Sequence, residues 1–429
     1  MNSSKDINPR RDPPSSQLPE AVKKPGRLWN INFLLLWQGQ FVSAVGDVIY
    51  EIALGFWVLA VTGSTGLMGA LMAASTIPRV LIAPFAGVLV DRSDRKWLLV
   101  AMDALRGAAI LFIAVAAYMG FLKVWMVFCA GIIIGIGAAF FNPTIGAALP
   151  DVVERENLVK ANSFFSMIRA GSGILGNSLG GFLYAFLGAP LMFLINSISY
   201  VFSSISEVFI KIPRISREMK RVSFFSDMKE GIRFVWRSTG LRFLMLAAGV
   251  INFFAYTGLV LIIPLFKSSD SLGPASYGIA MAVLTGGMIA GMTGTAIFTI
   301  KADWRVLYFG VCTVIFVTFL AVFPLWNNFF IMLIFLFIGG FTNAIVNVLL
   351  QSVVQLAVPQ AVRGKVMGLM ETLTQGMTPI GMAAGGLLGE VLPFKWIIFG
   401  AFTAIGLFIF PQLASKGVRD FFALEETTE

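Results

Sequence analysis

Long apolar runs alternate with short polar connections along the whole chain. Twelve runs approach or exceed the about 20 residues that a helix needs to cross the hydrocarbon core of a bilayer. They cover 30–60, 67–90, 97–118, 124–148, 161–187 and 190–210 in the first half, and 241–266, 275–300, 306–325, 328–355, 364–390 and 394–414 in the second. The pattern predicts an all-α polytopic membrane protein with 12 transmembrane helices in two six-helix halves.

The polar segments divide the chain further. We expect a disordered cytoplasmic tail over 1–28, six-helix bundles over 29–210 and 241–415, a cytoplasmic linker over 211–240 and a cytoplasmic tail over 416–429. In the linker, apolar residues recur at helical spacing between basic ones, which predicts an amphipathic helix on the anionic inner leaflet. The apolar residues are Phe224, Phe225, Met228, Ile232 and Val235, and the basic ones are Lys220, Arg221, Lys229, Arg233 and Arg237.

Basic residues are divided unequally between the two sides of these spans. Of the 32 Lys and Arg residues, 26 fall on the side that carries both ends of the chain. Lys123, Lys267 and Lys395 fall on the other side, and the remaining three lie inside spans. Because short cytoplasmic loops carry the excess of Lys and Arg, we expect a multi-pass protein of the cell membrane with both termini in the cytoplasm.

The composition narrows the class of function. Hydrophobic residues make up 57% of the chain and charged residues 13%, so we interpret the net charge of +9 as a topology signal and expect no nucleic acid. The sequence has no histidine, and Cys129 and Cys312 both lie inside apolar runs. We therefore expect no cofactor, no metal site and no enzymatic activity. A primary pump is disfavoured because the sequence lacks a G-x-x-x-x-G-K-[ST] phosphate loop.

The turn between the second and third runs, residues 87–97, is the strongest motif. Its charged side chains mark a membrane surface, because a charge is costly in hydrocarbon. The turn resembles the signature of the major facilitator superfamily, carried here by Gly87, Asp91, Arg92, Arg95 and Lys96. The resemblance implies the major facilitator fold and alternating access. We expect Arg92 and Arg95 to pair across the two halves and to close a cytoplasmic gate in the outward-facing state.

The two halves also look like one repeated unit. Asp94 and Asp303, and likewise Pro150 and Pro359, are 209 residues apart and fall in equivalent turns. Parallel repeats of this kind place the substrate site between the halves, near the midplane of the membrane.

A narrower resemblance lies in the turn 142–163 and in the linker segment 227–238. Both look like the macrolide-efflux and siderophore-exporter branch of the superfamily, which implies proton-coupled export of amphipathic or lipophilic small molecules. The glycines of the fifth run either pack helices closely or form the antiporter motif of proton-coupled exporters, which they resemble. They are Gly171, Gly173, Gly176, Gly180 and Gly181.

Polar stripes inside the runs give candidates for the transport pathway, because polar groups in a bilayer face the bundle interior or a water-filled cavity. Asp47 and Glu51 share one helical face near mid-membrane, and we expect at least one of them to carry the coupling proton. The alternative is a structural acid or a substrate contact. Residues expected to line the substrate cavity are Ser43, Tyr50, Asn252, Tyr256, Asn343, Asn347, Gln351, Glu371 and Gln375. Interhelical hydrogen bonding is the alternative role of the amides.

Three arginines inside runs, Arg79, Arg106 and Arg169, are the candidate counter-ions for these carboxylates. Arg106 follows Asp103 by three residues, a spacing that favours a structural ion pair. Arg79 and Arg169 have no evident local partner.

An exporter that works by alternating access is the leading hypothesis. The alternatives are a facilitator or flippase for a lipid-like substrate, and a passive channel. Expected partners are a small-molecule substrate, protons and membrane lipids, and we expect the protein to be a monomer.

Overall fold

The computed structural model describes residues 28–212, 224–269, 271–297 and 304–422. Within these residues the chain is helical apart from turns and short 3₁₀ segments, and it contains no strand, so the all-α prediction is confirmed. The helices are α1 (Ile31–Thr62), α2 (Thr65–Arg92), α3 (Arg95–Tyr118), α4 (Val124–Val152), α5 (Leu158–Val208), α6 (Phe224–Arg237), α7 (Thr239–Leu259), α8 (Ile262–Lys267), α9 (Pro274–Ile297), α10 (Arg305–Val322), α11 (Phe329–Ala357), α12 (Gln360–Gly389), α13 (Phe394–Leu413) and α14 (Lys416–Phe422).

Several residues singled out in the sequence lie outside this description. They are residues 1–27 of the expected tail, Lys220 and Arg221 of the linker, Asp303 of the repeat, and the side chains of Asp91, Arg92, Arg169, Phe224, Phe225 and Met228.

Polar residues placed just before the apolar runs start several helices. Asn30, Ser64, Asp94, Ser238 and Asn328 each accept a hydrogen bond from a backbone N–H in the first turn of α1, α2, α3, α7 and α11. Such caps satisfy N–H groups that have no partner within the helix. Asp94 of the basic turn therefore has a local structural role as the cap of α3.

Among the described residues, ten helical segments are long and apolar enough to cross a membrane. One of them, α5, contains a break at Gly188, whose φ of 70° favours glycine, so α5 makes two crossings. The 30-residue helix α12 is not among the ten, but it packs against α2 and α7 inside the bundle. With the break in α5 and with α12 included, the described helices supply the twelve predicted crossings.

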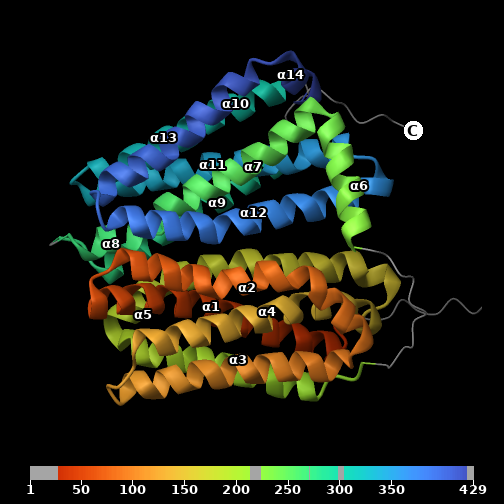
Figure 1. Cartoon of the computed structure of the whole chain (residues 1–429), viewed down its shortest axis with the longest axis vertical. Helices are drawn as coiled ribbons and strands as arrows, with labels where there is room; N and C mark the ends of the chain where they lie inside the picture. Colours follow the sequence, from red (N-terminus) through yellow and green to blue (C-terminus); the bar gives the residue numbers. More distant parts are fainter. Residues whose placement is uncertain (1–27, 213–223, 270, 298–303, 423–429) are drawn as a thin grey trace, which may run out of the picture.

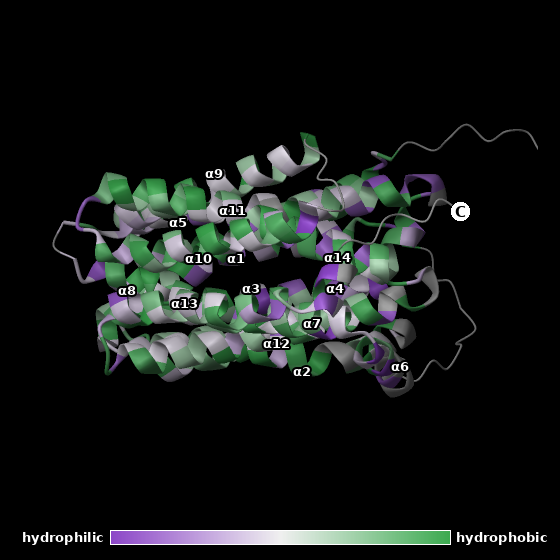
Figure 2. Cartoon of the chain, turned by 90° about the horizontal axis from the view of Figure 1, so that it is seen from above, coloured by the Kyte–Doolittle hydropathy of each residue, from purple (hydrophilic) through white to green (hydrophobic). Residues whose placement is uncertain are grey.

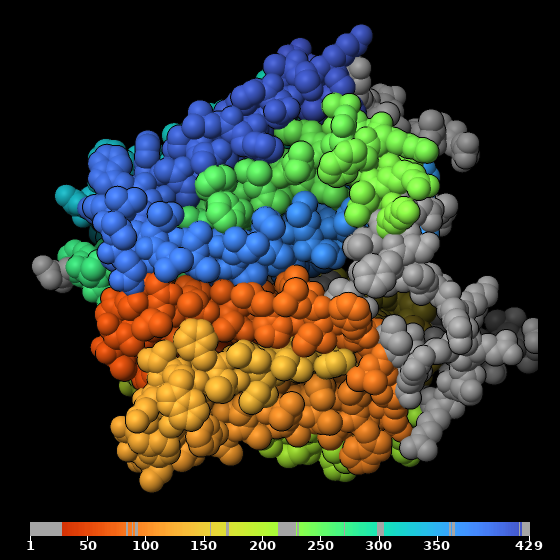
Figure 3. Space-filling view, in the orientation of Figure 1, coloured from red at the N-terminus to blue at the C-terminus, as the bar shows by residue number. Residues whose placement is uncertain are grey.

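The helices form two halves that lie side by side (Figures 1 and 3). In the first half, α4 packs against both α2 and α3, and α5 packs against α1 and α3. In the second half, α11 packs against both α9 and α10, and α7 packs against α12 and α13. The contacts of α4 are thus repeated by α11, as expected for a repeated six-helix unit.

The two ends of the bundle differ in character. The α2–α3 turn, α6 and α14 lie at one end, which we call the basic end, whereas the α1–α2 turn and α8 lie at the opposite end (Figure 1). Hydrophobic residues cover most of the helix length, and hydrophilic residues gather toward the ends and around α6 (Figure 2).

The segment expected to be an amphipathic linker helix is α6. Its Gly231 lies against the backbone of Lys365, and Val235 is buried, so one face of α6 packs on the start of α12. Ile232 and Trp236 are exposed. The segment expected as a C-terminal tail begins with α14, which packs on α7 and α10.

The halves contact each other mainly through two helix pairs, α2 with α12 and α5 with α9. Toward the opposite end these pairs approach at backbone distance. A Cβ atom on Gly69 would lie 2.4 Å from the carbonyl oxygen of Met382, and one on Gly181 would lie 2.2 Å from that of Pro274. Glycine at these positions lets the halves seal the opposite end.

The glycine-rich part of α5 serves helix packing at other positions as well. Cβ atoms on Gly176 and Gly180 would overlap Val48 and Ile52 of α1. Gly171 and Gly173, in contrast, have no neighbouring atom within 4 Å of a Cβ position. The packing role is therefore present at Gly176, Gly180 and Gly181, and the resemblance to an antiporter motif stays a prediction.

We expect Gly181→Ala to open the seal between the halves, because the added methyl group has no room beside Pro274. The distance between spin labels at Lys123 and Lys395, exposed residues at the opposite end of different halves, should lengthen in pulsed electron resonance measurements. Gly173→Ala is the matched control, since its methyl group meets open space. Equal distances in the two variants would show that this contact does not hold the seal.

Candidate functional site

A cavity of about 1270 Å³ lies between the two halves. It is lined from the first half by α1 to α5 and from the second by α11 and α12, and its lining reaches the basic end at Leu149, Asn162 and Lys365. Because the halves are sealed at the opposite end, the cavity opens toward the basic end. Its volume is ample for a drug-sized molecule.

Seven of the residues predicted from the sequence are brought together in the lining of this cavity. They are Ser43, Asp47, Arg79, Arg106, Gln351, Glu371 and Gln375.

Asp47 connects the cavity to buried side chains of the first half. Its carboxylate accepts hydrogen bonds from the hydroxyl of Tyr200 and, at 3.5 Å, from the amide of Asn196, both on the second limb of α5. A carboxylate that is held in this way remains at the cavity wall, where a substrate or a proton can reach it.

Arg106 contacts Tyr200 and is 5% exposed. Its guanidinium donates to the Tyr200 hydroxyl oxygen at 3.3 Å and to the carboxylate of Asp103, which confirms the predicted ion pair. The same group lies 4.3 Å from the ring centre of Phe141 and 4.6 Å from that of Tyr200, in cation–π geometry. Asp47, Tyr200, Arg106 and Asp103 thus form one connected network.

Arg79 links the two halves across the cavity. It donates to the side-chain oxygen of Gln375 at 2.9 Å, and the Gln375 amide donates to Glu371 at 2.9 Å. The partner that the sequence did not reveal for Arg79 is therefore on α12, in the other half. On its own side, Arg79 interacts electrostatically with Asp47 and Glu51.

Six other predicted residues are not part of the cavity lining among the described residues. They are Tyr50, Glu51, Asn252, Tyr256, Asn343 and Asn347. The amides are satisfied within their own helices, since Asn252 donates to the carbonyl of Ala248 and Asn347 to that of Asn343. Tyr50 is buried and packs on Phe193 inside the first half.

Arg95 of the basic turn has its partners on α4. Its guanidinium pairs with Asp151 at the end of α4 and donates to the carbonyl of Ala147 at 3.1 Å, so it binds within the first half and not across the two halves. The halves are apart at this end, where the cavity opens, so the expected pairing across them in the closed gate stays a prediction. Lys96 lies 5.6 Å from the ring centre of Trp97, and the space beside Gly87 is open.

The second limb of α5 carries functional candidates that the sequence reading missed. Asn196, Tyr200, Ser203 and Glu207 recur every three or four residues, and this helical spacing was the available signal. All four are buried.

The opposite end holds a second contact between the halves. Glu390, just after α12, accepts hydrogen bonds from the Ser64 hydroxyl at 2.5 Å and from the Gly66 N–H at 2.7 Å, at the N-terminus of α2. The hydroxyl of Thr65 donates to the carbonyl of Gly386 at 2.9 Å. A carboxylate is also favoured at a helix N-terminus by the helix dipole.

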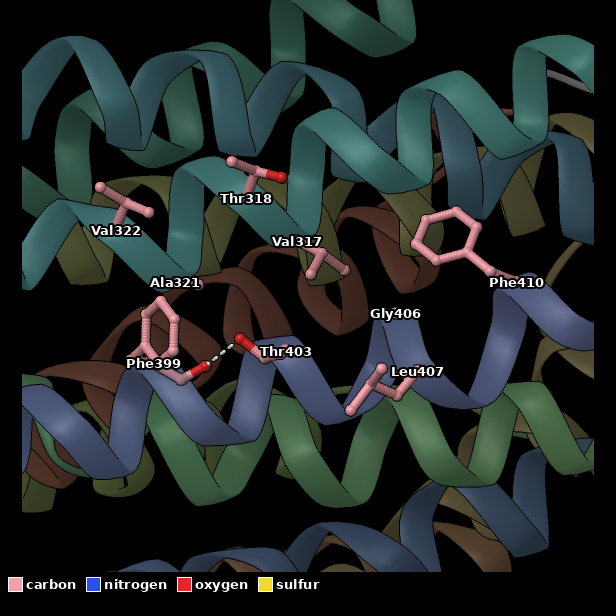
Figure 4. A pocket seen from close by; sticks show the side chains of 9 residues that line it. All are labelled: Val317, Thr318, Ala321, Val322, Phe399, Thr403, Gly406, Leu407 and Phe410. Atoms are coloured by element: carbon pink, nitrogen blue, oxygen red, sulfur yellow. Dashed lines mark hydrogen bonds between the residues drawn. The ribbon is translucent and has the colours of Figure 1, made fainter.

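A separate apolar pocket of about 280 Å³ lies between α10 and α13 (Figure 4). Its walls are apolar except for Thr318 and Thr403, and the Thr403 hydroxyl is already used by the carbonyl of Phe399, at 2.7 Å. With no ionisable residue in its lining, this pocket cannot take part in charge-linked transport.

Comparison with known proteins agrees with this geometry. A family model of the major facilitator superfamily, described as transmembrane secretion effector, matches residues 27–418. The chain belongs to this family. It is therefore a multi-pass membrane transporter, and the family places it among the efflux transporters of the superfamily.

Two relatives show the range of similarity. This transporter is 27% identical over 274 residues to macrolide efflux protein A of Streptococcus pyogenes, covering 62% of this chain and 67% of that protein. It is 24% identical over 373 residues to the multidrug efflux pump Tap of Mycobacterium tuberculosis, covering 83% of this chain and 87% of that protein.

Solved structures confirm the fold of this transporter. A bacterial homologue of the iron transporter ferroportin, in an inward-facing state, has a TM-score of 0.69 at 18% identity, covering 91% of this chain and all of that one. A bacterial homologue of the lysosomal transporter Spinster, also inward-facing, has a TM-score of 0.70 at 14% identity and covers 91% and 95%. The predicted major facilitator fold is thus confirmed.

We expect the Glu390 contact to depend on pH. The hydrogen bonds from the Ser64 hydroxyl and the Gly66 N–H lower the pKa of Glu390 below its ordinary value of 4.5. Because the pKa of Glu390 is lowered, the contact stabilises the sealed end fully at pH values above the ordinary pKa. This stabilisation is lost as the pH falls through the lowered pKa. The distance between spin labels at Lys123 and Lys395 should therefore lengthen in acid in the wild type.

Two variants check this reading of Glu390. Glu390→Gln should show the lengthened distance already at neutral pH, and Ser64→Ala should move the acid transition upward toward the ordinary pKa. If Glu390→Gln keeps the wild-type distance and the wild-type pH profile, the contact has no part in sealing the opposite end.

Proposed function

We propose that this transporter exports amphipathic or lipophilic small molecules in exchange for protons. One observation carries the proposal: the Asp47 carboxylate lines the large cavity between the halves and is hydrogen-bonded at the same time to the buried Tyr200. A carboxylate in that position can hold either a proton or a cationic group of a substrate. The named activities of the macrolide and multidrug relatives support an amphipathic or lipophilic substrate.

We propose further that the protein lies in the cell membrane with its basic end in the cytoplasm. The excess of Lys and Arg in the connections at that end supports this orientation. In it, the cavity faces inward, as in the inward-facing structures of the ferroportin and Spinster homologues. The two six-helix halves then rock against each other to expose the cavity to the outside.

In this cycle the basic turn closes the cytoplasmic gate. Arg95 is held by Asp151 while the cavity is open at the basic end, and it becomes available to the other half when α3 and α4 approach it. The variant Asp91→Asn tests the same cytoplasmic gate from α2, the helix on which Asp91 lies.

Asp47 exchanges its proton for substrate. In the outward-facing state Asp47 takes up a proton, and in the inward-facing state an amphipathic substrate that fills the cavity displaces that proton to the cytoplasm. Glu51, one turn along α1, and Arg79 set the charge around Asp47. Export against a gradient then follows from the inward flow of protons.

We expect Asp47→Asn and Glu51→Gln together to abolish uphill export driven by a pH gradient, because neither side chain can then release a proton. Exchange of substrate across proteoliposomes without a pH gradient should continue. Uphill export that survives in the double variant would rule out proton carriage by these residues. Loss of exchange as well would assign them to substrate binding, and downhill flux alone in the wild type would favour a facilitator or channel.

The linker helix α6 provides a separate test, which concerns its binding to an anionic membrane surface. Lys229, Arg233 and Arg237 are exposed beside Trp236, and each basic residue near an anionic leaflet contributes about 1 kcal/mol of binding. Replacing the three with Gln should lower transport more in anionic than in neutral liposomes. Lys267→Gln, at the opposite end, is the control. An equal loss in both lipids would give α6 a purely connecting role.

A further inference from the structure

A buried carboxyl group of the first half has no place in the cycle described so far. Glu207, near the end of α5, is 1% exposed, and neither of its carboxyl oxygens has a hydrogen-bond partner among the described residues. An ionised carboxylate without a partner is very costly in such a position. Glu207 therefore needs either a counter-ion or a proton.

Neighbouring contacts fix the depth of Glu207 in the bundle. The hydroxyl of Ser204 donates to the carbonyl of Val100 on α3, and the backbone N–H of Lys211 donates to the side chain of Asn32 on α1. Glu207 lies between these two levels, and α1 and α3 both start at the basic end. The carboxyl group is thus close to the basic end of the first half, one to two helical turns beyond Asp103.

The charges that face Glu207 are few. From α3 it interacts with Asp103, which is fully buried, and with Arg106. Residues 31–46 of α1 contain no ionisable side chain. Arg95, in the first turn of α3, is engaged by Asp151 of α4. Lys211, four residues further along the chain, is exposed, whereas Arg106 is a cation buried in the same half as Glu207.

Arg106 is shared among three carboxyl groups. It is bonded to Asp103, it reaches Asp47 through the Tyr200 hydroxyl, and it acts on Glu207 over a longer distance. One guanidinium keeps a single positive charge in proteins, so it cannot balance three ionised carboxyl groups at once. One oxygen of Asp103 also lacks a hydrogen-bond partner among the described residues, so the network has more carboxyl groups than charge to match them.

We propose that Glu207 is a second proton-binding site, whose occupancy alternates with that of Asp47 because both carboxyl groups depend on Arg106. This rests on the proposed function, which it deepens. When Asp47 takes up a proton, its negative charge disappears. The positive charge of Arg106 then stabilises only the carboxyl groups of Asp103 and Glu207. Glu207 can then ionise, and its proton leaves toward the basic end.

The reverse step restores the network. When substrate displaces the proton from Asp47, the Asp47 carboxylate again interacts with the positive charge of Arg106. Glu207 then takes up a proton from the basic end. Each proton bound at Asp47 is balanced by one released from Glu207, so the buried charge stays constant throughout. Over a complete cycle Glu207 releases one proton at the basic end and regains one there, so the net movement is the one proton that Asp47 takes up from the outside.

Infrared difference spectroscopy of the purified transporter, titrated with pH in the absence of substrate, tests this directly. The wild type should show the C=O band of a protonated carboxyl group at neutral pH, and Glu207→Gln should lack that contribution. In Asp47→Asn, which imitates a protonated Asp47, the Glu207 band should disappear at a pH about one unit lower than in the wild type. This shift corresponds to a coupling free energy of about 1.4 kcal/mol between the two sites. Ser204→Ala, whose hydroxyl is bonded to the carbonyl of Val100 outside this network, should leave the band in place.

Three results would overturn the proposal. An identical band in Glu207→Gln would show that Glu207 holds no proton. If the Glu207 band of Asp47→Asn disappears at the same pH as in the wild type, the two sites are independent. This variant leaves Glu207 in its native surroundings. A band that vanishes on addition of sodium at fixed pH would assign the group to a metal cation. Failure of the proposed function would be seen elsewhere, as absence of uphill export by the wild type under a pH gradient.

Discussion

The exclusion of charge from hydrocarbon is the constraint on which this structure depends. Arg106 can stay inside the first half because Asp103 neutralises it and because the rings of Phe141 and Tyr200 cover its faces. The same cation lines the cavity and is connected to Asp47 through the hydroxyl of Tyr200. A group that is costly to bury thus connects the interior of one half with the surface on which substrate arrives.

The two ends of the bundle are held by different kinds of contact. At the opposite end, glycines bring backbones together and the Glu390 carboxylate caps a helix of the other half. At the basic end, long charged side chains such as Arg95 bind within their own half. Backbone contacts require a close, fixed fit, whereas long side chains can change partner as the halves move. The difference suits a structure sealed at one end and open at the other.

The sequence was most informative where hydrophobicity alone decides the structure. The twelve crossings followed from the length of the apolar runs, and the break at Gly188 falls between two of them. The amide stripe of α11 was a poorer guide, because an amide such as Asn347 can satisfy itself on its own helix. The partner of Arg79 could not be predicted, since Gln375 lies almost 300 residues away and only the packing of α2 on α12 brings them together.

The short helix α14 has a consequence for how the protein is made. Val418 and Phe422 are buried, and Phe421 fills the space beside Gly240 at the start of α7. The packing of the second half is therefore completed by residues that follow its last membrane-spanning helix. A chain that stopped before α14 would leave the surface around Gly240 uncovered, and quality-control proteases can recognise such a product.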